Sequence, residues 1–175
     1  MVLRHHFVRW STFVQKAAIP AFVIVCVAGF LLGTLYGAST LHWYPMWIRT
    51  AAESGVSFWG FWIPSLLPLL IAGYALYIEK PQFLYLICFI KTFAFAHCAF
   101  SAVAAFGQAG WLVRFLFQFS DIFSIPVLFW LSLRHITGNA HDFKRDLVIS
   151  ASISAVFCGI DYCIVSPFLA MLIEV

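Results

Sequence analysis

Five long apolar runs, separated by polar stretches, form the pattern of this chain. Each run is close to the roughly 20 residues that an α-helix needs to cross the hydrocarbon core of a bilayer. The pattern therefore predicts an all-α bundle of five transmembrane helices in a single domain, residues 1–175. We expect the first run to be a membrane helix and not a cleavable signal peptide, because it has full bilayer length. The predicted spans are 17–38, 58–78, 83–106, 111–133 and 147–172.

Basic residues in the polar stretches predict how the bundle is oriented. Seven fall on one side of the predicted spans and two on the other, while Lys91 lies within a span. Cytoplasmic loops carry the excess of Lys and Arg, so we expect a cytoplasmic N-terminus and, after five crossings, an external C-terminus. This is the pattern of a multi-pass protein of the cell membrane. The seven are Arg4, Arg9, Lys16, Lys80, Arg134, Lys144 and Arg145, and the two are Arg49 and Arg114.

Composition excludes several classes of protein. Apolar residues make up 63% of the 175 residues and charged residues 10%, whereas a soluble domain is nearer half apolar and a quarter charged. A soluble enzyme, a nucleic-acid-binding domain and a disordered chain are therefore excluded. The formal net charge of +3 fits cytoplasmic loops. The five cysteines lie in apolar runs without a CxxC pair, which is typical of buried apolar side chains. We expect no cofactor and no metal.

The first span carries glycines at four-residue spacing, Gly29, Gly33 and Gly37. Because these glycines share one helix face, a neighbouring helix can approach closely there. Two interpretations are open: packing inside the bundle, or docking of a membrane helix from another protein or a second copy. Prolines predict kinks, since each removes a backbone donor. They are Pro64 and Pro68 in the second span and Pro126 in the fourth.

Charged residues within the predicted spans are candidates for paired internal sites. A charge in the hydrocarbon region is costly, so each is expected to face the interior and have a partner. Lys91 lies about 13 Å from the cytoplasmic start of its helix, and Asp121 lies about 15 Å from the outer end of its own. His97 and Asp161 are each about 21 Å from the cytoplasmic edge. Matching depths predict two pairs, Lys91–Asp121 and His97–Asp161. Such pairs serve either as internal clamps or as parts of a proton or ion relay.

Three segments carry a resemblance to a known family: Ala28–Gly37 with its small-x-x-x-Gly pattern, the proline-bearing Asp121–Val127, and Gly159–Pro167 with its acidic and aromatic residues before Ser-Pro. The chain resembles the stage II sporulation protein M family of small bacterial membrane proteins. This resemblance implies a noncatalytic scaffold that holds cell-wall-degrading partners at the septal membrane.

We therefore expect a noncatalytic scaffold in the bilayer that anchors or recruits a membrane-protein partner through the first span, or self-associates. The alternative is a small proton- or ion-coupled transporter that uses Lys91, Asp121, His97 and Asp161. No motif of a hydrolase, metalloprotease or nucleotide-binding enzyme is present, so we do not expect an enzyme.

Overall fold

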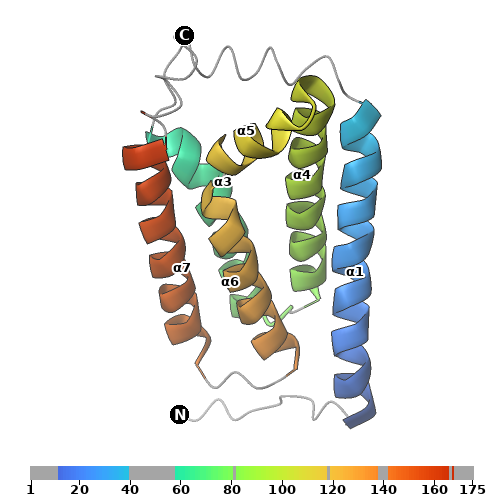
Figure 1. Cartoon of the computed structure of the whole chain (residues 1–175). Helices are drawn as coiled ribbons and strands as arrows, with labels where there is room; N and C mark the ends of the chain where they lie inside the picture. Colours follow the sequence, from blue (N-terminus) through green and yellow to red (C-terminus); the bar gives the residue numbers. More distant parts are fainter. Residues whose placement is uncertain are drawn as a thin grey trace.

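The computed structural model describes residues 12–39, 58–80, 82–117, 119–137, 142–165 and 167, and all of its regular elements are helices (Figure 1). The prediction of an all-α chain is confirmed for this part of the chain. The elements are α1 (Thr12–Ser39), α3 (Phe58–Tyr77), α4 (Phe83–Phe106), α5 (Ala109–Phe117), α6 (Phe119–Ile136), α7 (Phe143–Ile160) and the π-helical turn η1 (Asp161–Val165).

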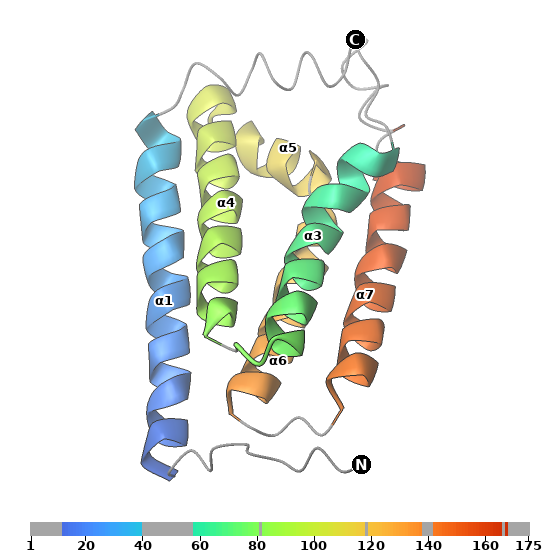
Figure 2. The ribbon, with the colours of Figure 1, turned by 180° about the vertical axis from the view of Figure 1, so that it is seen from behind.

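Five of the helices lie side by side with alternating direction. α1, α4 and α7 run one way, and α3 and α6 run the other way (Figures 1 and 2). α1 forms one edge of the bundle beside α4, and α7 forms the opposite edge beside α3 and α6. The short α5 lies obliquely between the end of α4 and the start of α6.

In the part of the chain that the structure describes, three helical segments are long and apolar enough to cross a membrane: Ala17–Ser39, Phe83–Phe106 and Lys144–Ile164. The first two match the predicted spans 17–38 and 83–106. The third overlaps the predicted span 147–172 from residue 147 to residue 164 and starts three residues earlier. The described apolar part of α3, Leu66–Tyr77, is shorter.

The surface of the bundle is apolar and its interior is unusually polar. Large side chains such as Leu35 and Tyr77 are exposed, whereas Lys91, Arg114 and Asp161 are buried. An apolar core of side chains from α1, α3, α4 and α6, including Phe22, Leu69, Leu84 and Leu128, holds the centre of the bundle. This distribution is the one that a protein solvated by lipid requires.

The glycine face of α1 packs directly on the backbone of α4. An added Cβ would lie 2.6 Å from the carbonyl oxygen of Phe89 at Gly29, 2.3 Å from that of Phe93 at Gly33, and 2.5 Å from that of His97 at Gly37. The hydroxyl of Ser101 donates to the carbonyl of Gly37 across the same seam at 3.1 Å. Of the two interpretations of these glycines, internal packing is the one present, so a partner helix cannot use this face while α4 occupies it.

The fourth predicted span, 111–133, is not one straight helix. The described helices α5 (Ala109–Phe117) and α6 (Phe119–Ile136) run in different directions (Figures 1 and 2). α5 crosses close to the end of α4, where Gly110 lies against Ala102. Only a glycine fits at this contact, because an added Cβ at Gly110 would lie 2.3 Å from the Ala102 carbonyl oxygen. With nine residues, α5 covers about half of the thickness that a crossing helix requires.

The stretch between the predicted spans 111–133 and 147–172 is helical at both of its ends. α6 continues to Ile136, and α7 begins at Phe143. The carboxylate of Asp142 accepts hydrogen bonds from the amides of Lys144 and Arg145, which caps α7. Asp146 is therefore a helical residue of the bundle interior. α3 and α6 continue through Pro64, Pro68 and Pro126, and the kinks predicted there stay a prediction.

Candidate functional site in the bundle interior

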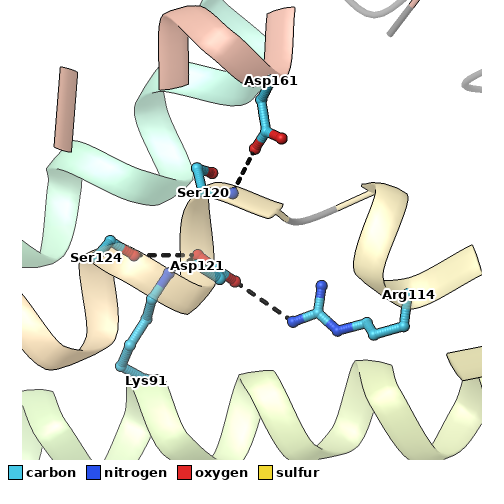
Figure 3. A network of polar contacts seen from close by, with 6 residues as sticks. All are labelled: Lys91, Arg114, Ser120, Asp121, Ser124 and Asp161. Carbon is cyan, nitrogen blue, oxygen red and sulfur yellow. Dashed lines mark hydrogen bonds and ion pairs between the residues drawn. The ribbon is translucent and has the colours of Figure 1, made fainter. Parts of the chain in front are cut away.

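Asp121 is the centre of a buried charged cluster (Figure 3). Lys91 Nζ on α4 lies 2.6 Å from Asp121 Oδ1, and Arg114 Nη2 on α5 lies 3.4 Å from Asp121 Oδ2. The hydroxyl of Ser124, one turn further along α6, lies 3.4 Å from Asp121 Oδ1. The predicted contact between Lys91 and Asp121 is therefore present, and Arg114 is a second cation that the sequence reasoning had placed in an external group.

Arg114 is positioned by the short α5. Its guanidinium carbon lies 4.7 Å from the centre of the Phe95 ring, so the cation also rests on an aromatic face. Its Nε and Nη1 atoms have no hydrogen-bond partner among the described residues. One carboxylate thus serves two buried cations, which makes Asp121 the residue on which the cluster depends.

Asp161 is held at the start of α6. The backbone amide of Ser120 donates to Asp161 Oδ2 at 2.7 Å (Figure 3). The first amides of a helix have no intrahelical acceptor, so Asp161 caps α6 from another helix and places its charge at the positive end of the helix dipole. The π-helical turn η1 starts at Asp161. The break between α5 and α6 is therefore stabilised by two carboxylates, Asp121 and Asp161.

The predicted pair His97–Asp161 is wrong. The ring of His97 lies 5.6 Å from that of Tyr36 on α1 and 6.0 Å from that of Phe93. Within the described chain, α4 makes no contact with α7 or η1. Lys91 and His97 are six residues apart, a rotation of about 240° around the helix. They therefore lie on different faces of α4, with Lys91 toward α6 and His97 toward α1.

A second polar group lies at the other end of α7, around Asp146. Arg134 Nε is 3.4 Å and His135 Nε2 is 3.8 Å from Asp146 Oδ2. The guanidinium of Arg134 also lies over the Trp130 ring, 5.0 Å from its centre. Asp146 is 1% exposed. The sequence reasoning missed this group because it counted these charges as loop residues, although Asp142 as a helix cap was a usable signal.

Four buried polar side chains face one side of the helical segment formed by α7 and the first residue of η1: Asp146, Ser150, Ser154 and Asp161. The hydroxyls of Ser150 and Ser154, both oxygens of Asp146 and Oδ1 of Asp161 have no hydrogen-bond partner among the described residues. Each such group carries a penalty of about 1–3 kcal/mol if it stays unsatisfied. We call these four residues the polar side of α7.

Three threonine hydroxyls in the bundle are satisfied by the backbone of their own segment. Those of Thr34, Thr92 and Thr137 donate to the carbonyl four residues earlier at 2.7–2.8 Å. The hydroxyls of Ser150 and Ser154 do not make this bond. The polar side of α7 therefore presents hydrogen-bonding groups to the interior.

Metal chemistry has no candidate in the described residues, which contain no group of three or more His, Cys, Asp or Glu side chains able to hold an ion. The five cysteines are free thiols, of which Cys26, Cys88 and Cys158 are buried. The Cys88 sulfur lies 3.3 Å from the hydroxyl of Ser132.

The three segments that resemble stage II sporulation protein M lie in different parts of the fold. Ala28–Gly37 forms the seam of α1, Asp121–Val127 starts α6, and the described part of the third segment ends α7 and forms η1. The family resemblance stays a prediction, because no protein-family model, no curated protein and no solved structure matches this chain.

Proposed function

We propose that this protein is a noncatalytic membrane scaffold that recruits a partner through the outer face of α1. The observation that carries the proposal is the position of α1. It stands at the edge of the bundle and packs mainly on α4 (Figures 1 and 2). Because its glycine face is used for that contact, the opposite face is free to meet another membrane helix.

The outer face of α1 consists of Ile24, Leu31 and Leu35. At 100° per residue, these three lie within about 20° of one direction and point away from Gly33. Their exposed fractions are 66%, 55% and 71%. A row of branched apolar side chains at seven- and four-residue spacing resembles the seam of helix pairs that pack side by side. The partner we propose is a membrane helix of another protein, with cell-wall-remodelling factors as the class that the family resemblance suggests.

A scaffold has to hold its docking helix in a fixed position, and two features support this. The α1–α4 seam is built on direct backbone contact, and Lys91 ties α4 to α6 through Asp121. α1 is therefore connected to the centre of the bundle through α4, and a partner on the outer face would be held in a defined geometry.

We also propose five membrane crossings, with the N-terminus in the cytoplasm and the C-terminus outside. The alternating directions of α1, α3, α4, α6 and α7 support this number (Figures 1 and 2). The seven-to-two distribution of basic residues supports the orientation. In this arrangement α5 lies within the outer half of the bundle and does not cross.

Cysteine accessibility tests this topology. A cysteine introduced at Lys80 or Lys144 is expected to react with a membrane-impermeant reagent only from the cytoplasmic side, and one at Gly107 only from outside. These positions are exposed at helix ends. Labelling of position 107 from the cytoplasm would overturn the orientation and the side assigned to every connection.

Photocross-linking in native membranes tests the scaffold function. A benzophenone amino acid at Leu31 on the outer face of α1 is expected to give a discrete protein adduct. The matched control is the same amino acid at Leu70, which is 61% exposed on α3, where no discrete adduct is expected. Equal adducts at both positions, or none at Leu31, would contradict docking on α1.

The alternative carrier built on Lys91, Asp121, His97 and Asp161 has less support. Its four groups do not form one path, because His97 lies against α1 and Asp121 is paired with two cations. We therefore place the scaffold ahead of a carrier that uses these four residues.

A further inference from the structure

The polar side of α7 has a use that scaffolding does not require. Asp146, Ser150, Ser154 and Asp161 are each no more than 1% exposed, and each has an oxygen without a hydrogen-bond partner in the described part of the chain. From Asp146 to Asp161 the distance along the helix is about 22 Å, which is most of the roughly 30 Å hydrocarbon layer. Unpartnered oxygens therefore recur through the membrane-compatible length of α7.

The helices packed on α7 leave these oxygens without protein partners at the middle of the bundle. Among the residues of α3 whose burial the structure describes, the buried ones carry no polar side chain: Leu69, Ala72, Gly73 and Ala75. On α6, the charged groups lie only near the two ends of the row, with Arg134 and His135 beside Asp146, and Asp121 near Asp161. Arg114 of α5 and Lys91 of α4 reach the second end through Asp121. Between these ends, water is the group able to satisfy Ser150 and Ser154.

The spacing of the row fits a chain of water molecules. Successive members at four-residue intervals, such as Asp146, Ser150 and Ser154, are about 6 Å apart along the helix. One water that bridges two oxygens spans about 5.6 Å, the sum of two O–H···O distances of about 2.8 Å. The seven-residue step from Ser154 to Asp161 is about 10.5 Å and needs more than one water.

We propose that the polar side of α7 is a water-filled path for protons between Asp146 and Asp161. A proton hops when an O–H bond forms on the acceptor oxygen as the O–H bond of the donor breaks. Each hop leaves the next oxygen ready to donate, so one proton enters at one carboxylate and one leaves at the other. Nothing is oxidised or reduced, and no other reactant is needed. This activity goes beyond the proposed scaffold and does not depend on a partner.

Proton flux in liposomes tests the path. The whole chain is reconstituted with a pH-sensitive dye inside the vesicles, and a potassium gradient with valinomycin drives protons inward. We expect flux above that of protein-free vesicles, and at least a tenfold loss with Asp161→Asn. Ser154→Leu is expected to block the path, whereas the matched control Ser152→Leu, on the exposed side of α7, is expected to conduct like the wild type.

An isosteric pair separates loss of the path from loss of the fold. Ser154→Thr keeps the hydroxyl and Ser154→Val removes it, while the two side chains have nearly the same shape. The Thr variant is expected to retain flux and the Val variant to lose it. Solid-state NMR transfer from water protons to Ser150 and Ser154 measures hydration independently and is expected to be strong. Wild-type flux equal to protein-free vesicles, equal flux in the Thr and Val variants, or no water transfer at these serines would overturn the path.

Discussion

Among substitutions that replace a charged side chain of the bundle by an uncharged one, Asp121→Asn is expected to be the most destabilising. It removes the carboxylate that pairs with both Lys91 and Arg114, and breaking a buried ion pair from one side costs about 3–5 kcal/mol. Lys91→Met is expected to cost less, because Asp121 keeps Arg114 at 3.4 Å. The cluster thus predicts that Asp121→Asn destabilises the protein more than Lys91→Met does. A simple pair of charges does not predict this order.

Thermal unfolding in detergent measures this order. The double variant Lys91→Met with Asp121→Asn should recover part of the loss, and adding Arg114→Met should recover more, since no buried charge then lacks a partner. Asp142→Asn is the matched control, because asparagine caps a helix about as well as aspartate. A triple variant no more stable than Asp121→Asn alone would contradict the account of this cluster.

Gly33→Leu is expected to separate α1 from α4. An added Cβ at this position lies 2.3 Å from the carbonyl oxygen of Phe93. The clash is with backbone, so a rotamer change in a side chain cannot relieve it. Overpacking of this kind costs about 1–3 kcal/mol, and the melting temperature should fall whether or not a partner is present.

Ala21→Leu is the control for this substitution, because it introduces the same leucine side chain within α1 at an exposed position. It is expected to leave the melting temperature close to that of the wild type. If Gly33→Leu has the same melting temperature as Ala21→Leu but loses a bound partner, the glycine face is a docking surface and the account of its packing on α4 is wrong.

The sequence was sufficient to predict α1 and α4 and the depth of the charged side chains within the bundle. Hydropathy predicted the membrane-compatible segment of α1 (Ala17–Ser39) and the whole of α4 to within one residue, because an apolar run of bilayer length has few other structures. The matching depths of Lys91 and Asp121 also predicted the contact that these two side chains make. Depth is only one coordinate, however. The rotation of about 240° between Lys91 and His97 directs His97 away from α6, so a matching depth does not bring it to Asp161.

The hydropathy pattern does not predict the break between α5 and α6, since both helices are apolar on average. Its cause is tertiary: Gly110 permits the close crossing at Ala102, and Asp161 from a distant segment caps the new helix start. Asp146 was missed for a different reason. A charge beside other charges was assigned to a loop, although its four-residue spacing to Ser150 placed it on the buried side of α7.

Recovery of a partner from native membranes tests the scaffold most directly. The outer face of α1 is changed by Ile24→Ala, Leu31→Ala and Leu35→Ala, and the matched control changes Leu67, Leu70 and Ile71 on α3, which are also exposed. The account predicts that the wild type and the control recover the same partner. The α1 variant is expected to keep the melting temperature of the wild type and to recover at least tenfold less of that partner. Equal recovery with both triple variants, or no partner with the wild type, would contradict it.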